Sequence, residues 1–304
     1  MTRGHLTRAI ADGPVILDGG LATLLQARGH DLSSSLWSAR LLMDDPDAIV
    51  AAHAEYFAAG AQVATSASYQ ASYEGFAALG LDRTESAHLI RRSVKLARSA
   101  RDDSERGGWV AASVGPYGAI LADGSEYRGD YGLTVTELRD FHRPRLTVLA
   151  ESEPDILALE TMGCLAEVEA ILAETEQLGL PAWLAVTVAR GRLRSGEPVA
   201  EAFAMAADAP HVVAVGLNCS APEEVLGVVQ QAASVRPAVA YPNSGQSWDA
   251  EARAWVGTST FDPGMVRAWV DAGARLVGGC CRVGPDEIRA LAGAVKRPTE
   301  SYDI

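Results

Sequence analysis

Eight short apolar runs recur along this chain, and each is separated from the next by sequence that favours a helix. Several of these runs are apolar almost throughout, which is typical of strands buried on both faces in a parallel sheet. Eight strand-then-helix repeats predict a (β/α)8 barrel, and 304 residues are enough to form one. The predicted strands are Val15–Asp18, Gln62–Ser68, Trp109–Val114, Ile156–Glu160, Ala182–Val188, Val212–Asn218, Ala238–Tyr241 and Arg275–Gly278.

The alternative architecture is an open, doubly wound sheet. The repeats are regular, however, and no dinucleotide-binding glycine pattern is present, so we favour the closed barrel. No linker, low-complexity tract or shift in composition divides the chain. We therefore expect residues 1–304 to form a single barrel domain.

Charge and cysteine content exclude several classes of function. A net charge of −13 and a pI near 4.9 argue against nucleic acid or an anionic membrane as a partner. Asp12 and Asp18 interrupt any apolar stretch that could serve as a signal peptide, and no apolar run approaches the roughly 18 residues of a membrane span. Four cysteines, two of them adjacent, do not resemble a disulfide framework. These features predict a cytoplasmic protein with reduced thiols.

Three cysteines follow two of the predicted strands. Cys219 ends the sixth strand, and Cys280 and Cys281 follow the eighth. Alternate strands of a barrel contribute side chains to the same interior layer, so these residues can meet at the C-terminal rim. Three thiolates suit Zn²⁺, and three protein ligands leave one tetrahedral position free for a substrate. The sequence therefore predicts a catalytic zinc site.

The remaining cysteine and the histidines are predicted to be structural. A lone cysteine most often fills a core as a small hydrophobic residue, and we interpret Cys164 in this way. None of the six histidines forms a cluster with ligand spacing.

Because consecutive strand residues face opposite sides, the strand must end before Cys280 and Cys281 if both bind one ion. We expect Gly278 and Gly279 to supply the backbone freedom for that break.

Polar residues also stand at other strand ends. Asp18, followed by Gly19, ends the first strand, and Glu160 ends the fourth. A glutamate at the end of an apolar strand is costly to bury without a partner, so function or a buried ion pair explains it better than chance. Together the two carboxylates favour binding of a cation such as a substrate ammonium. Asn218 is a further candidate for substrate binding, whereas turn formation explains Asn243 nearly as well.

These residues carry a resemblance to a known family. The chain resembles the zinc-dependent homocysteine S-methyltransferases over nearly its whole length, and the combination of Asn-Cys with Gly-Gly-Cys-Cys is the specific part of the match. The matching stretches are Leu17–Gly20, Ser68–Ser72, Gly115–Ala119, Asp123–Tyr127, Glu160–Thr161, Gly216–Ser220, Tyr241–Gly245 and Gly278–Cys281.

The resemblance implies a (β/α)8 barrel whose zinc is held at Cys219, Cys280 and Cys281, with homocysteine as methyl acceptor. It further implies that Asp18 and Glu160 lie near the amino group of homocysteine and that Tyr69 contributes to substrate binding. The length and the Gly-Pro-Tyr-Gly segment are similar to those of the stand-alone enzymes that use S-methylmethionine or S-adenosylmethionine.

Two loops leave questions open. Residues 189–198 contain three arginines where the family usually has an acidic loop, and inward-pointing arginines would repel a sulfonium donor. This departure leaves the choice of donor open. The connection Leu121–Tyr131 follows the third strand and is equally consistent with a lid over the site or with a surface loop.

The chemistry implied by these residues needs no protein nucleophile. A free thiol is mostly protonated at neutral pH, and coordination to zinc would deprotonate it. A sulfonium donor is already activated, so the thiolate of the substrate itself acts as the nucleophile. Alternatives are another thiol or selenol acceptor such as selenohomocysteine, betaine as the donor, or a non-catalytic barrel with structural zinc. We expect a monomer or a small homo-oligomer.

Overall fold

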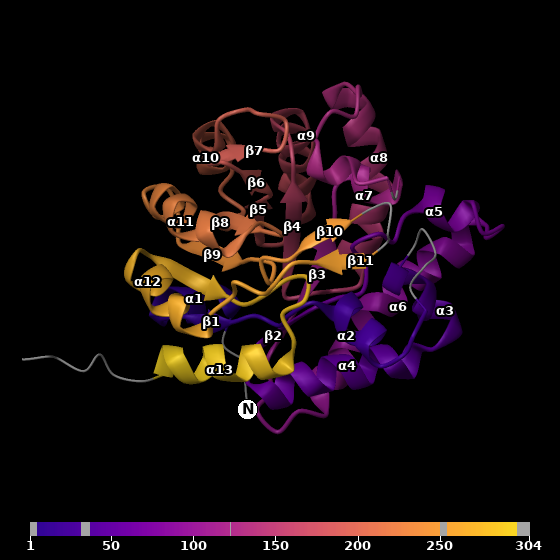
Figure 1. Ribbon diagram of the computed structural model, residues 1–304. Helices are drawn as coiled ribbons and strands as arrows, with labels where there is room; N and C mark the ends of the chain where they lie inside the picture. Colours follow the sequence, from indigo (N-terminus) through magenta and orange to yellow (C-terminus); the bar gives the residue numbers. More distant parts are fainter. Residues whose placement is uncertain (1–4, 32–36, 122, 250–253, 297–304) are drawn as a thin grey trace, which may run out of the picture.

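The computed structural model describes residues 5–31, 37–121, 123–249 and 254–296 (Figure 1). Eight parallel strands form one sheet in the order β1-β12-β9-β8-β5-β4-β3-β2. The strands are β1 (Val15–Ile16), β2 (Val63–Thr65), β3 (Trp109–Val114), β4 (Ile156–Met162), β5 (Ala182–Val186), β8 (Val212–Asn218), β9 (Ala238–Tyr241) and β12 (Ala274–Val277).

The sheet closes between its two outermost strands. β1 pairs in parallel with β12 along its length. On its other side, Leu17 forms a single bridge with Val63. The amide of Gln62 also donates a hydrogen bond to the carbonyl of Ile16 at 2.7 Å. The predicted (β/α)8 barrel is thereby confirmed, although β1 and β2 are shorter than predicted.

Helices surround the barrel (Figure 1). Several begin at the caps that their sequences supply: Asp82 and Glu85 form a reciprocal capping box, as do Thr134 and Glu137, and Asp45 caps a helix that begins at Pro46. The longer helices are α4 (Pro46–Ala59), α6 (Arg83–Asp102), α8 (Val135–Glu151), α9 (Leu165–Thr175), α10 (Val199–Ala207), α11 (Val225–Ala233) and α13 (Pro285–Lys296). The shorter ones are α1 (Leu6–Asp12), α2 (Leu21–Ala27), α3 (Leu41–Asp44), α5 (Tyr73–Ala77), α7 (Tyr117–Leu121) and α12 (Val266–Asp271), and the 3-10 turns are η1 (Trp37–Arg40), η2 (Ser125–Tyr127), η3 (Glu176–Leu178), η4 (Pro222–Glu224) and η5 (Pro263–Met265).

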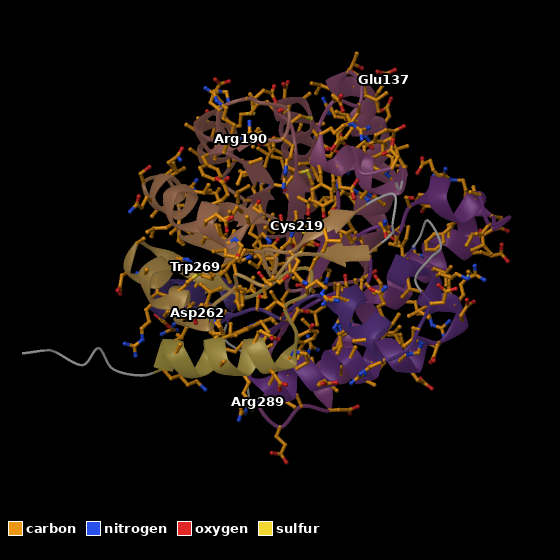
Figure 2. The ribbon with its side chains drawn as sticks, in the orientation of Figure 1. Glu137, Arg190, Cys219, Asp262, Trp269 and Arg289 are labelled. Atoms are coloured by element: carbon orange, nitrogen blue, oxygen red, sulfur yellow. The ribbon has the colours of Figure 1, made fainter. Side chains whose placement is uncertain are left out.

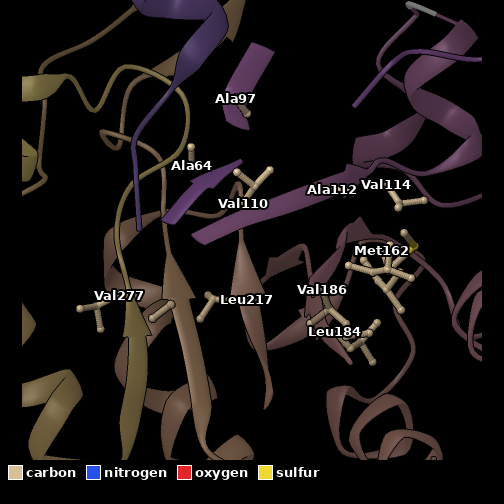
Figure 3. Close-up of a cluster of buried hydrophobic side chains, with 14 of the residues drawn as sticks. Ala64, Ala97, Val110, Ala112, Val114, Met162, Leu184, Val186, Leu217 and Val277 are labelled. Carbon is tan, nitrogen blue, oxygen red and sulfur yellow. The ribbon is translucent and has the colours of Figure 1, made fainter. Parts of the chain in front are cut away.

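Alternate residues of most strands enter two different cores. In β3, Ala111 belongs to the cluster inside the barrel, whereas Val110 and Ala112 pack outward against the helices (Figure 3). This alternation is what a pleated strand with both faces buried requires. The inner cluster also contains Leu6 and Ile10 of α1. The N-terminal helix thus covers the end of the barrel opposite the strand C-termini.

Two hairpins lie outside the barrel and have no counterpart in the sequence prediction. β6 (Val188–Ala189) pairs antiparallel with β7 (Arg192–Leu193), and β10 (Ser247–Asp249) pairs antiparallel with β11 (Ala254–Val256). Both follow the C-terminal end of a barrel strand. Within the described part of the chain, no helix is long and apolar enough to cross a membrane. That residues 1–304 form a single domain stays a prediction.

Candidate active site

A cavity of about 130 Å³ lies at the C-terminal ends of the barrel strands. All eight predicted site residues line it, and they come from segments far apart in the sequence: Asp18, Gly19, Tyr69, Glu160, Asn218, Cys219, Cys280 and Cys281. Cys219 is close to the centre of the molecule in Figure 2, whereas Glu137 and Arg190 lie at its periphery. The barrel therefore brings the predicted residues together at one place.

The three cysteines form a compact cluster. Their Sγ atoms all lie within 4.8 Å of one another. Cys219 has a φ of +46°, which turns the chain sharply at the end of β8. The amide of Cys280 donates to the carbonyl of Pro242 at 2.7 Å, and the amide of Cys281 donates to Oδ1 of Asn243 at 3.2 Å. Backbone contacts to the segment after β9 thus hold the cysteine pair in place.

The sequence prediction for the two glycines before the pair is wrong in its reason. Neither Gly278 nor Gly279 has a φ in the left-handed region. Their role is to leave space, since a Cβ on Gly278 would lie 2.7 Å from the carbonyl oxygen of Asp18, and one on Gly279 would lie 2.1 Å from Cγ1 of Val283. The left-handed residue of this turn is Arg282, at a φ of +65°.

The donor set fits a thiophilic metal ion such as zinc. Hydrogen bonds from the Cys280 and Cys281 thiols lower the pKa of Cys219 well below its usual range and raise those of the two donors. The cluster therefore favours a thiolate at Cys219, which is the form that binds a metal ion. Among the described residues, this is the one group of three or more Cys, His, Asp or Glu side chains close enough to hold a metal ion. Three ligands leave a tetrahedral ion one open position.

Asp18 and Glu160 are buried carboxylates held by neighbouring hydroxyl groups. The amide and the hydroxyl of Thr65 donate to Asp18 at 2.7 and 2.8 Å. Ser113 donates to Oε1 of Glu160, and the hydroxyl of Tyr241 donates to its Oε2 at 3.0 Å. Burial raises the pKa of Asp18 to about 7 and that of Glu160 to about 8. A cation placed beside them would favour their ionised forms.

Asn218 lies beneath the cavity and binds its neighbour on β4. Its Oδ1 accepts from the amide of Thr161 at 2.7 Å, and its Nδ2 donates to Oγ1 of Thr161 at 2.8 Å. Thr161 has a φ of +63°, a conformation that β-branched residues rarely adopt. The Thr161 side chain in turn hydrogen-bonds the Cys219 sulfur. The Asn218 amide thus positions Thr161; its contact with substrate stays a prediction.

The segment after β3 contributes residues to the site. Glu126 and Tyr127 line the cavity together with Tyr69, so the loop that was equally consistent with a lid or a surface segment forms one wall of the site. Glu126 and Tyr127 were not among the site residues predicted from the sequence. They could have been found from the resemblance to the family, since both belong to the matching stretch Asp123–Tyr127.

A buried polar network anchors this wall from behind. Oε1 of Glu167 accepts from the amide of Tyr117 at 2.6 Å and from Nε2 of His142 at 2.9 Å. Arg145 donates to Nδ1 of His142 at 2.9 Å and also to the carbonyl of Gly115. The side chains of these three network residues are fully or almost fully buried. The network ties α8 and α9 to the start of α7, where the wall begins.

The arginine-rich loop does not point its charges into the cavity. Arg190 and Arg192 are exposed, at the turn of the β6–β7 hairpin. Arg194 is more buried, and its guanidinium lies 5.3 Å from the centroid of the Tyr127 ring. Its Nε donates to the hydroxyl of Thr187 at 3.3 Å. Arg194 is absent from the cavity lining, so Tyr127 separates it from the space in front of the cysteines.

Cys164 and the histidines lie outside the cavity lining. Cys164 is buried just before α9, and burial raises its pKa to about 12, so it remains a neutral thiol. This agrees with a structural role. His53 is fully buried in α4, and neither ring nitrogen has a hydrogen-bond partner among the described residues.

Comparison with known proteins assigns the chain to a family. The description of the homocysteine S-methyltransferase family matches residues 15–295. The chain belongs to this family. Homocysteine S-methyltransferase 4 of Zea mays is 46% identical, and the match covers 97% of this chain and 92% of the relative. Selenocysteine Se-methyltransferase of Brassica oleracea var. italica is 43% identical over 92% of this chain and 88% of the relative.

A solved structure supports the same assignment. The metallated form of the homocysteine methyltransferase MmuM from Escherichia coli superposes with a TM-score of 0.84 at 42% identity, covering 94% of this chain and 98% of the other. The family predicted from the sequence is confirmed, and with it the barrel fold and the class of enzyme, a methyltransferase.

Proposed function

We propose that this protein transfers a methyl group from a sulfonium donor, S-methylmethionine or S-adenosylmethionine, to the sulfur of homocysteine, giving methionine. The observation that carries the proposal is the convergence of three cysteine sulfurs, within 4.8 Å of one another, on a cavity that two further carboxylates line. Membership of the homocysteine S-methyltransferase family supports it.

In this proposal Cys219, Cys280 and Cys281 hold zinc at the floor of the cavity. Zinc, when bound, would keep the thiol of homocysteine deprotonated at neutral pH and thus nucleophilic. Zinc is preferred over harder cations because the three donors are soft sulfur atoms. The metallated structure of MmuM supports the presence of a metal ion, and we propose zinc from the chemistry of the three sulfur donors.

The amino group of homocysteine is assigned to Asp18 and Glu160. Each carboxylate already accepts two hydrogen bonds from the protein, which fixes its orientation, and each oxygen retains a further lone pair for an ammonium N–H. Gly19 and Tyr69 border the same space. Held in this way, the acceptor sulfur faces the open mouth of the barrel, and positioning supplies much of the rate enhancement.

The decisive experiment pairs a donor screen with loss of a ligand. We expect the purified, zinc-loaded protein to methylate homocysteine with S-methylmethionine or S-adenosylmethionine and not with betaine. Cys281→Ser should lose both bound zinc and activity, because a neutral hydroxyl replaces one of three thiolate ligands. Cys164→Ser is the matched control and should keep both, since Cys164 does not line the cavity.

Zinc content by elemental analysis and methionine formation by chromatography are the two measurements. Activity in Cys281→Ser without bound metal would contradict the mechanism. A metal bound by four protein ligands would instead favour a structural zinc, although the described residues supply three.

A second acceptor is favoured by one comparison, the similarity to a selenocysteine Se-methyltransferase. A selenol is a softer and more acidic nucleophile than a thiol and suits the same soft metal site. Competition between homocysteine and selenocysteine for a limiting donor distinguishes the two acceptors.

A further inference from the structure

Three carboxylates line the cavity, and they differ in how many hydrogen bonds they already accept. Asp18 and Glu160 each accept two from neighbouring residues. Glu126 is different, because its Oε2 is buried and accepts no hydrogen bond within the part of the chain that the structure describes. A buried polar atom without a partner is rare in a native protein and calls for an explanation.

The described residues around Glu126 supply no partner for its Oε2. Among the described residues no cationic side chain lines the cavity, and Arg194 of the fifth loop packs on Tyr127. Burial raises the pKa of Glu126 to about 7, while the charge of Arg128 acts in the opposite direction. The carboxylate is therefore kept close to the cysteine cluster at an energetic cost, which a cationic ligand would offset.

We propose that Glu126 is the residue that selects a cationic methyl donor, by facing the sulfonium group across the cavity from Cys219. This inference rests on the proposed methyl transfer. Tyr69 and Tyr127 border the same space and present aromatic rings, which attract a cation without needing a hydrogen bond.

The chemical difference between the two substrates supports this division of the carboxylates. The ammonium of homocysteine carries N–H donors and suits acceptors fixed by hydroxyl groups, as Asp18 and Glu160 are. A sulfonium centre carries no N–H, so it is recognised by charge and aromatic faces alone. Glu126, with an unused oxygen beside two tyrosines, meets that requirement.

The electron balance of the step predicts which kinetic constant depends on Glu126. A lone pair of the homocysteine thiolate forms the new carbon–sulfur bond, and the electron pair of the breaking bond goes to the donor sulfur. The positive charge of the sulfonium therefore decreases toward the transition state and disappears in the product. Attraction to Glu126 is strongest before transfer, so it stabilises the bound donor more than the transition state, and its loss should raise the KM of the donor without lowering kcat.

The test compares Glu126→Gln with Glu160→Gln, each of which removes a charge while keeping the size of the side chain. For Glu126→Gln we expect the KM of S-methylmethionine to rise roughly tenfold or more, with the KM of homocysteine and the zinc content unchanged. We expect kcat to stay within about twofold of the wild type. Glu160→Gln should raise the KM of homocysteine instead.

A binding measurement separates charge recognition from a structural effect. Isothermal titration with S-methylmethionine, and with methionine as its neutral counterpart, requires no turnover. The wild type should prefer the sulfonium, Glu126→Gln should lose that preference, and Glu126→Asp, which keeps the charge, should retain most of it. Retained preference in a folded Glu126→Gln protein, or a rise in the homocysteine KM alone, overturns the inference. A wild type that transfers methyl from no sulfonium donor would instead overturn the proposed function.

Discussion

Thr161 is a strained residue beside the active site. A β-branched residue at a φ of +63° costs roughly 1–3 kcal/mol, and such strain persists only where the surrounding structure enforces it. Asn218 enforces it here through two hydrogen bonds, one to the backbone and one to the hydroxyl. The same hydroxyl reaches the Cys219 sulfur, so the strained residue links the fourth and sixth barrel strands at the cysteine cluster.

Replacing Asn218 should release this strained turn. In Asn218→Ala, the buried amide and hydroxyl of Thr161 lose their partner, which should lower the free energy of unfolding by about 2–3 kcal/mol. Homocysteine turnover should fall as well, because Cys219 loses a neighbour that orients it. Asn218→Asp keeps an acceptor for the Thr161 amide and should recover part of the stability. Denaturant unfolding of the two variants is the measurement, and equal stability of Asn218→Ala and the wild type would contradict the assignment.

At the same scale, the sequence identified some carboxylates and not others. Asp18 and Glu160 could be predicted because each ends an apolar run, where a charge is conspicuous. Glu126 stands in a polar loop of glycine, serine and charged residues, so its burial leaves no trace in the local pattern. The position of Glu126 depends on how that loop packs across the cavity. This packing involves contacts between segments far apart in the chain, which the local sequence pattern does not predict.

The wall formed by α7 and η2 depends on elements behind it. Glu167 on α9 receives the first amide of α7, and His142 and Arg145 on α8 complete the network. Tyr117 also packs edge-on against Phe141 of α8 and Tyr131, at centroid distances of 5.1 and 5.7 Å. The position of Glu126 is thus set by two helices on the outside of the barrel.

Removing the centre of this network should affect both stability and donor binding. Glu167→Ala leaves the His142 ring and the Tyr117 amide without their shared acceptor, and we expect unfolding to become easier by about 3 kcal/mol. The KM of the methyl donor should rise because the wall loosens. Glu169→Ala, an exposed position on the same helix, should change neither quantity appreciably. Thermal unfolding and donor titration provide the two readouts; similar results for both variants would exclude an anchoring role.

Element boundaries were predictable where local chemistry determines them and not elsewhere. Asp262 caps η5, whose first residue is Pro263, and Gly273 follows α12 with a φ of +113°, which are the roles that these residue types favour at helix ends. The turn before the cysteine pair was predicted for the wrong reason, because conformational freedom and lack of space both select glycine. Only the neighbours of Gly278 and Gly279, distant in sequence or on the next turn, distinguish the two explanations.

At the scale of the whole molecule, barrel topology explains why distant residues could be placed together. Once eight alternating units were recognised, the ends of the sixth and eighth strands had to lie on one rim. In the structure β9 lies between β8 and β12, pairs with both, and connects the segments that carry Cys219 and the cysteine pair. The strand count and the fold followed from periodicity, whereas the two added hairpins depend on loop conformation.

Global stability should depend on pH through His53. Burial lowers the pKa of His53 to about 4, from the 6.5 of an exposed histidine. The unfolded chain therefore takes up a proton below about pH 6.5 while the folded protein does not, and stability falls as pH decreases toward 4. At 1.36 kcal/mol per unit, the loss amounts to about 3 kcal/mol.

The measurement is the free energy of unfolding from pH 7 to pH 4 for the wild type and for His53→Met. Because all other titrating groups are shared, the difference between the two curves isolates the histidine. We expect the wild type to lose stability relative to the variant as the pH falls, and parallel curves would refute the assignment.

The closure of the barrel between β1 and β2 has a consequence for how this protein responds to its substrate. One backbone bridge, Leu17 to Val63, joins these strands beside the site, and the next link along the seam is the pair of hydrogen bonds from Thr65 to the Asp18 carboxylate. Asp18, the side chain assigned to the substrate ammonium, therefore also joins β1 to β2 in the barrel wall. The ammonium of a bound amino acid and the Thr65 hydrogen bonds would use the same two carboxylate oxygens of Asp18. Substrate binding should therefore change the hydrogen-exchange rates of backbone amides between β1 and β2.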